Sequence, residues 1–285
     1  MNSNAKYLTL VRRELWEHRG LWMAPLIGVA LLLVAAVWGI NNISGINISN
    51  EPLQSPDRAV QIGAASLLGI SSAIGLFACI VTGIYLLDCL LAERKDRSIL
   101  FWKSLPVSDA QTVLTKLGLA LLLMPLYVLL LSVVLQPLLA LIIGLRFAPF
   151  ESHLGGLMLG SLKTLPYLAG GWFFAVLWYA PVATYLMLAS VLARRTPIVY
   201  AIVPPVALAV AEHLLFDTRH VASFVGKRLA QPFIHRAADL PADGSINLQI
   251  DWSMLFPRPD LWLGLIAAAA MAYGVVRLRR YRDDT

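Results

Sequence analysis

The sequence predicts an all-α polytopic membrane protein, formed by a single transmembrane domain of residues 1–285. Hydrophobic residues make up 58% of the chain and charged residues only 14%, whereas a globular protein carries about 25% charged residues. The mean hydropathy is +0.70. Six segments are long and apolar enough to form transmembrane helices, each of which needs about 20 apolar residues. The short alternating segments that are typical of a β-barrel do not compete with this pattern, so we expect six helices.

Residues 1–20 are predicted to form an amphipathic helix that lies in the membrane interface. The apolar side chains recur at helical spacing, and the charged side chains fall on other faces of the same helix. Trp16 and Trp22 are suited to the headgroup region, where tryptophan is enriched. A solvated basic leader is the alternative interpretation. The apolar set is Tyr7, Leu8, Val11 and Leu15, and the charged set is Arg12, Arg13, Glu17 and Arg19.

The apolar segments give approximate bounds for the six transmembrane helices. The first segment has the basic flank of a signal peptide, but it is too long for one, and Trp38 stands where small cleavage residues are required. Ser108 and Gln111 match a capping box, so the third helix should begin there, before its apolar run. The six apolar segments are 21–40, 66–91, 115–145, 167–192, 197–216 and 261–278.

Lysine and arginine are distributed unevenly between the two sides of the predicted bundle. Fifteen of the 23 fall on the side of the termini, and the two short loops on the other side hold three. The long loop on that side carries the other five, which its five aspartates balance. Because cytoplasmic loops are enriched in lysine and arginine, we expect both termini in the cytoplasm. The same distribution explains the net charge of +6 without any binding of nucleic acid.

The loop between the second and third predicted helices, residues 92–107, combines dense charge with large apolar side chains. Water should not be in contact with such apolar residues, and a passive surface turn does not need them. A charged turn with an apolar patch is typical of a surface that binds another protein. The charged residues are Glu93, Arg94, Lys95, Asp96 and Arg97, and the large apolar residues include Ile99, Phe101 and Trp102.

The extracytoplasmic segment between the fifth and sixth predicted helices, residues 217–260, contains two patterns. Four apolar residues share one helical face and predict a short amphipathic helix. In residues 246–252, apolar and polar residues alternate, which predicts a half-buried strand. We expect this segment to form a lid over the outer end of the bundle. The four residues of the helical face are Val221, Phe224, Val225 and Leu229.

The sequence lacks the catalytic motifs that would indicate an enzyme. No G-x-x-x-x-G-K-[ST] stretch occurs, so this chain has no P-loop for ATP. The G-x-S-x-G elbow and the H-E-x-x-H zinc helix are also missing. Cys79 and Cys89 lie about 15 Å apart along one predicted helix and cannot form a disulfide with each other. We therefore expect no catalytic residue, metal site or cofactor in this chain.

Glu212 and His213 form an ionisable pair within the fifth predicted helix. A charged residue within a membrane indicates a substrate or gate role by default. An interfacial pair at a helix end is the alternative, because both residues lie near the outer end of the segment. A proton-coupled secondary transporter or an intramembrane lipid-modifying enzyme would also use such a pair. The transporter would need ionisable groups near the midplane, and the enzyme would need a third convergent polar group.

The order of these elements resembles the permease subunit of a type-2 ATP-binding-cassette (ABC) transporter. The resemblance covers essentially the whole chain, from RRELWEHR in the N-terminal helix through the ERKDRSILFWKSLPVSD turn to the basic tail. In that family the turn after the second span is the coupling helix, which sits in a groove of the ATPase. The resemblance implies that Glu93 to Arg97 meet polar residues of that groove. Ile99, Phe101 and Trp102 would fill its apolar part or pack under the turn.

The resemblance also implies the partners and the location of the protein. Two ABC ATPase subunits would bind ATP and Mg²⁺, and a second permease subunit, expected to be an identical copy, would complete the membrane part. The expected function is export of a substrate across the bacterial inner membrane, powered by those separate ATPase chains. The family usually places short re-entrant helices before its last span. Here the segment 217–260 is longer, so its form is open.

Overall fold

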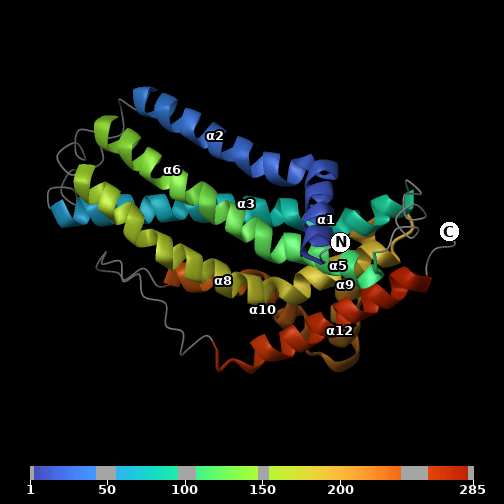
Figure 1. Cartoon of the computed structure of the whole chain (residues 1–285). Coiled ribbons are helices and arrows are strands. Elements are labelled where there is room, and N and C mark those ends of the chain that lie inside the picture. The colour runs from blue at the N-terminus through green and yellow to red at the C-terminus, as the bar shows by residue number, and fades with distance from the viewer. Residues whose placement is uncertain (1–2, 43–55, 96–106, 147–153, 239–255, 282–285) are drawn as a thin grey trace.

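The computed structural model describes residues 3–42, 56–95, 107–146, 154–238 and 256–281, and every regular element in them is a helix. Six helices are long and apolar enough to cross a membrane, which confirms the all-α multi-pass fold. The predicted strand at 246–252 and most of the predicted coupling segment lie outside the described residues. In chain order the elements are α1 (Ser3–Glu17), α2 (Arg19–Asn42), α3 (Pro56–Lys95), α5 (Asp109–Gly118), the π-helical turn η2 (Leu119–Leu123), α6 (Met124–Arg146), α8 (Leu154–Leu192), α9 (Pro197–Phe216), α10 (His220–Ala238) and α12 (Pro259–Tyr281) (Figure 1).

Helix α8 is central to the bundle and packs against α3, α6, α9, α10 and α12 (Figure 1). Its first turns approach α3 closely because two glycines, four residues apart, face α3. A Cβ at Gly156 would lie 2.6 Å from Cγ2 of Val60, and one at Gly160 would lie 3.3 Å from the Cβ of Ala64. Small residues at this spacing let two membrane helices pack backbone to backbone. The helix therefore begins at Leu154, well before the apolar run from which its start was predicted.

The bundle contains two apolar clusters and a polar contact between three helices. Because lipid is as apolar as leucine, close packing and interhelical hydrogen bonds stabilise such a bundle more than burial from water does. Nε2 of Gln136 on α6 donates to Oγ of Ser71 on α3 at 3.0 Å, and Oγ1 of Thr164 on α8 donates to Oε1 of Gln136 at 2.7 Å. All three residues are buried. This contact fixes α3, α6 and α8 in register.

The third span is a continuous helix with a widened turn. Oγ of Ser108 accepts from the N–H of Gln111 at 3.2 Å, and the N–H of Ser108 donates to Oε1 of Gln111 at 3.0 Å, which confirms the predicted capping box. After α5, the turn η2 has π-helical hydrogen bonding, and the N–H of Met124 donates to the carbonyl of Leu119. The next residue, Pro125, has no N–H to continue the helical pattern, which accounts for an irregular turn at this point.

Helix α1 is confirmed as a helix, and it contacts the bundle through a partly polar face. Leu10 and Glu14 are buried, whereas Leu8 is 71% exposed and Trp16 is 63% exposed. Of the predicted apolar face, Val11 and Leu15 pack against the bundle, whereas Tyr7 and Leu8 are exposed. The placement of α1 in a membrane interface stays a prediction.

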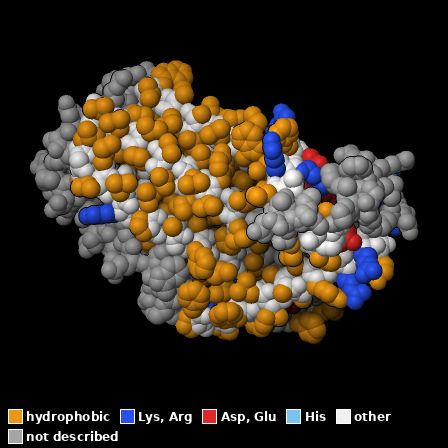
Figure 2. Space-filling view, in the orientation of Figure 1, with side chains coloured by type: hydrophobic (Ala, Val, Ile, Leu, Met, Phe, Trp, Pro, Cys, Tyr) orange, Lys and Arg blue, Asp and Glu red, His pale blue; other side chains and the backbone are white. Residues whose placement is uncertain are grey.

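The surface separates apolar and charged side chains. Figure 2 shows hydrophobic side chains over most of the visible face, with charged side chains gathered mainly toward the end where α1, α5 and the last turns of α12 lie. Arg279 near the end of α12 contacts Glu93, and Lys116 contacts Glu14 of α1, so both ends of the described chain lie at this end of the bundle. That arrangement requires an even number of spans. The cytoplasmic location of this end stays a prediction.

Candidate functional site

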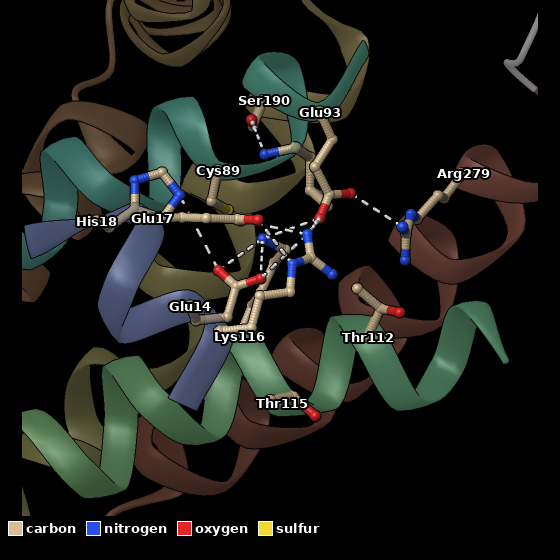
Figure 3. A network of polar contacts seen from close by, with 12 residues as sticks. Glu14, Glu17, His18, Cys89, Glu93, Thr112, Thr115, Lys116, Ser190 and Arg279 are labelled. Carbon is tan, nitrogen blue, oxygen red and sulfur yellow. Dashed lines mark hydrogen bonds and ion pairs between the residues drawn. The ribbon is translucent and has the colours of Figure 1, made fainter. Parts of the chain in front are cut away.

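Buried charged side chains join four helices at the end of the bundle that holds both chain ends (Figure 3). Lys116 of α5 lies at the centre and is fully buried. Its Nζ lies 2.7 and 2.8 Å from the two carboxylate oxygens of Glu14 on α1 and 3.2 Å from Oε1 of Glu93 on α3. Together with two arginines, these residues form what we call the ion network: Arg13, Glu14, Glu93, Lys116 and Arg279.

The two arginines complete the contacts of Glu93. Nη2 of Arg279 on α12 lies 2.9 Å from Oε2 of Glu93, and Nη2 of Arg13 on α1 lies 3.2 Å from Oε1. Burial acts to lower the pKa of Arg13, but its hydrogen bond to Glu17 and the nearby carboxylates outweigh burial and raise that pKa. Glu93 is thus shared by three cations from α1, α5 and α12.

Glu14 and its neighbours sit on faces that point into the bundle. Oε2 of Glu14 accepts from the hydroxyl of Tyr85 on α3 at 3.0 Å. His18, one turn after Glu14, packs edge-on against Tyr85 with ring centroids 4.9 Å apart. Burial, together with the charge of Lys116, lowers the pKa of His18. A buried charge is tolerated only when its partners are in place, and here every carboxylate oxygen of Glu14 and Glu93 has at least one.

The last turn of α3 is also attached to the end of α8. Nη2 of Arg94 donates to the carbonyls of Ser190 at 2.6 Å and Ala193 at 2.9 Å. An arginine at this position satisfies carbonyls that a helix end leaves without partners. In return, Oγ of Ser190 accepts from the N–H groups of Leu90 at 3.2 Å and Leu91 at 3.1 Å. The chain therefore leaves α3 from an anchored turn.

Only the start of the predicted docking segment lies in the described residues. Glu93 is 5% exposed and Arg94 is partly buried, so both contact the bundle itself, whereas Lys95 is exposed. The docking role of the segment stays a prediction. The remaining predicted docking residues, Asp96, Arg97, Ile99, Phe101 and Trp102, lie outside the described part of the chain.

Glu212 closes the turn between α9 and α10. Its Oε1 accepts from the hydroxyl of Thr218 at 2.7 Å and the N–H of His220 at 2.8 Å, and its Oε2 accepts from the N–H of Val221 at 2.7 Å. A carboxylate in this position satisfies the free N–H groups at a helix start. His213 instead lies 3.5 Å from the carboxylate of Asp217. The geometry agrees with the helix-end interpretation of Glu212, and a gate role stays a prediction.

Glu14, Glu17 and His18 are close enough to offer three ligand atoms to a metal ion. Both oxygens of Glu14 already contact the ammonium group of Lys116. The lysine thus supplies the positive charge that a metal would bring. We interpret the group as part of the ion network.

An apolar cavity of about 260 Å³ lies between α3, the third span and α8. Its wall includes Ala120 of the π-helical turn, Leu229 of α10 and Trp172. Trp172 packs where Gly75 lacks a side chain, since a Cβ there would lie 1.9 Å from the indole ring. Its buried Nε1 has no hydrogen-bond partner among the described residues. The cavity suits an apolar group.

No protein-family model, curated protein or solved structure matches this chain.

Sequence reasoning missed the ion network as a site. Glu14 lies within the string RRELWEHR, and Lys116 and Arg279 are among the fifteen lysines and arginines on the side of the termini, but none of the three was singled out. A signal was present, because Glu14 follows the buried Leu10 by one helical turn, and Lys116 follows the buried Val113 by three residues. A charge on the buried face of a helix predicts a partner on another element. The identity of that partner depends on tertiary packing.

Proposed function

We propose that this chain is the permease subunit of an ABC exporter, which moves a substrate across the bacterial inner membrane while separate ATPase subunits hydrolyse ATP. The observation that supports this best is the ion network at the root of the charged segment. Glu93 is the first residue of that charged segment, and it contacts cations on three other helices. A segment that transmits an ATPase movement needs a firm attachment to several spans, and this network supplies one.

The attachment exists on both sides of the segment. Before it, Glu93 contacts α1, α5 and α12, and Arg94 contacts the end of α8. After it, Ser108 caps α5, the helix that carries Lys116. In the proposed mechanism, a displacement of residues 96–106 moves α3 and α5 together. The contacts of Glu93 and Arg94 then pass that movement to α12 and α8.

The proposed partners follow from what the chain offers and lacks. With no P-loop in its sequence, the chain relies on two ATPase subunits to bind ATP and Mg²⁺. Helix α9 has one buried residue, Ala201, and exposes apolar side chains that include Leu208 and Leu214. This apolar surface is suited to membrane lipids or to a second permease subunit, which we expect to be an identical copy. A secondary transporter or enzyme that uses Glu212 and His213 gains no support, because Glu212 caps α10.

Co-purification tests the proposal. Each ABC-type P-loop ATPase of the host organism is co-expressed with the chain in turn, and one of them is expected to purify with it as a stable complex. Phe101→Asp places a charge in the expected apolar contact and should release the ATPase or abolish stimulation of its activity, because an unpaired buried charge is heavily penalised. Phe256→Asp, the same change at an exposed position just before α12, is the matched control. Wild-type chain that binds no ATPase, or a Phe101→Asp chain that binds as well as the control, contradicts the proposal.

Arg97→Ala is a second docking variant, whereas Glu93→Ala is unsuitable. Removal of Glu93 would leave three cations without a shared carboxylate, so loss of the complex could follow from damage to the fold. Arg97→Ala should weaken ATPase binding while the melting temperature of the permease alone stays unchanged.

A further inference from the structure

Arg228 is a buried cation far from the ion network. It belongs to α10 and is 5% exposed. Its guanidinium carbon lies 4.3 Å from the ring centroid of Trp178 on α8, and its Nη1 donates to the carbonyl of Asp260 at 3.0 Å. Asp260 and Arg279 are nineteen residues apart on α12, which corresponds to about 28 Å. Arg228 therefore lies near the opposite end of the bundle.

One edge of the Arg228 guanidinium is unused. Nε and Nη2 are buried and have no hydrogen-bond partner among the described residues. These two N–H groups point the same way, and they form the edge that binds two oxygens of one carboxylate or phosphate. Burial lowers the pKa of Arg228, an effect that the charge of Asp260 opposes. A buried charge with open donors is costly, and within membranes such charges mark functional sites.

Neighbouring groups hold Arg228 in a defined position. Nε1 of Trp178 donates to the carbonyl of Arg228 at 2.9 Å. This carbonyl is available because residue 232, which would bond to it in a regular helix, is proline and has no N–H. The hydroxyl of Tyr179 donates to the carbonyl of Leu229 at 2.9 Å. Gly264 of α12 makes room for the guanidinium, since a Cβ there would lie 1.8 Å from Nη2.

We propose that Arg228 binds the anionic headgroup of a membrane amphiphile, whose phosphate or carboxylate oxygens accept hydrogen bonds from Nε and Nη2. A membrane amphiphile is favoured over a soluble anion because the guanidinium lies between membrane-spanning helices α8 and α12. The next residue, Leu229, lines the apolar cavity of about 260 Å³. Such amphiphiles are then the cargo class of the exporter. That last step rests on the proposed function, whereas the binding itself does not.

The test measures binding to the purified full chain alone, in an uncharged detergent and without ATPase. Fluorescently labelled phosphatidylglycerol is titrated and its anisotropy recorded, with labelled phosphatidylcholine in parallel. Phosphatidylglycerol should bind at least tenfold more tightly than phosphatidylcholine. Arg228→Gln and Gly264→Ala should each weaken this binding at least tenfold. Lys227→Gln removes the same charge from an exposed neighbour, and Gly274→Ala adds the same methyl group to α12 where no atom lies within 4 Å, so both should bind normally.

A second Arg228 variant and a competition with inorganic phosphate complete the test. If Arg228→Gln does not fold, Arg228→Lys keeps the charge but loses the two-donor edge, and it should bind several-fold more weakly than the wild type. Inorganic phosphate at millimolar concentration should not displace the lipid. Displacement of the lipid by phosphate would show that the site binds a soluble anion. Equal binding of both lipids, or unchanged binding in the Arg228 and Gly264 variants, would show that Arg228 has only a structural role. Each of these results overturns the proposal. A failure of ATPase co-purification leaves this binding result unchanged, so the two proposals fail separately.

Discussion

Two buried cations of this chain have opposite surroundings. Lys116 has three carboxylate oxygens within 3.2 Å, whereas Arg228 has one carbonyl, one aromatic face and two N–H groups without partners among the described residues. Both side chains are at most 5% exposed. The contacts of the first cation are complete within the described residues, whereas the second keeps two open donors there. The comparison distinguishes charges that stabilise the fold from a charge that we propose to bind a ligand.

The largest effect is expected from Lys116→Met. The change leaves Glu14 and Glu93 with fewer cations in a buried site, and removal of one partner from a buried ion pair costs about 3–5 kcal/mol. We expect a large drop in melting temperature and in yield of monodisperse protein in detergent. Lys163→Met removes an exposed lysine from α8 and is the matched control. Equal melting temperatures for the two variants would show that the ion network does not stabilise the fold.

A double variant distinguishes loss of the contact between Glu14 and Lys116 from the cost of leaving one of these buried charges without its partner. Glu14→Gln combined with Lys116→Met removes both partners of the shortest ion pair. The double variant should be more stable than the sum of the two single effects predicts, because residues in direct contact do not act additively. Additive losses would mean that the two side chains act independently.

Much of the fold was predictable because hydropathy, charge and capping signals are local. The six spans and the start of α5 at Ser108 and Gln111 follow from residues close together in the sequence. The early starts of α3 and α8 were not predictable in this way. Their first turns are less apolar, and they are held by the close contact of Gly156 and Gly160 with Val60 and Ala64, which depends on which helices cross.

The candidate sites were less predictable than the fold. Glu212 was singled out because it lies within an apolar run, but its partners at Thr218, His220 and Val221 require knowledge of the turn that follows. Arg228 was not singled out, although it follows Phe224 of the predicted apolar face by one helical turn. It is buried because Gly264 of α12 leaves space for it and because Trp178 stacks on it. Neither contact leaves a signal near Arg228 in the sequence.

A smaller effect is expected at the polar contact between α3, α6 and α8. Gln136→Leu removes the hydrogen bonds to Ser71 and Thr164. Interhelical hydrogen bonds in membranes contribute about 0.6 kcal/mol on average and less than about 2 kcal/mol at most. The melting temperature should fall clearly less than for Lys116→Met. A loss as large as that of Lys116→Met would place this contact, and not the ion network, at the centre of stability.

Arg228→Met should change stability by less than about 1 kcal/mol, in either direction. The variant loses one hydrogen bond to a carbonyl and the contact with Trp178, but it also removes an incompletely paired buried charge, and such replacements are often neutral. Melting is compared with that of Lys116→Met in the same uncharged detergent. A loss of 3–5 kcal/mol would mean that Arg228 stabilises the fold as Lys116 does, and the contrast between the two would disappear.

The smallest effect concerns pH. Because the pKa of His18 is lowered in the folded chain, the unfolded chain binds the proton more readily, so stability should decrease as pH falls below about 6.5. His18→Gln should flatten the melting temperature between pH 7 and pH 5. An unchanged pH profile in this variant would assign the pH dependence to other groups. The charged or titratable groups that act on His18 are Glu14, Glu17, Tyr85, Asp88 and Lys116.

The π-helical turn η2 sets the rotational phase of the third span. On one side of it Lys116 reaches Glu14, and on the other side Gln136 reaches Ser71 and Thr164. Each residue of an α-helix advances the chain by about 100° around the axis. An unbroken α-helix through the same residues would therefore turn Gln136 by about 100° whenever Lys116 stayed in place. The extra residue in the turn rotates the second half of the span relative to the first half. One helix can therefore contribute both to the ion network and to the polar contact of Gln136 with Ser71 and Thr164.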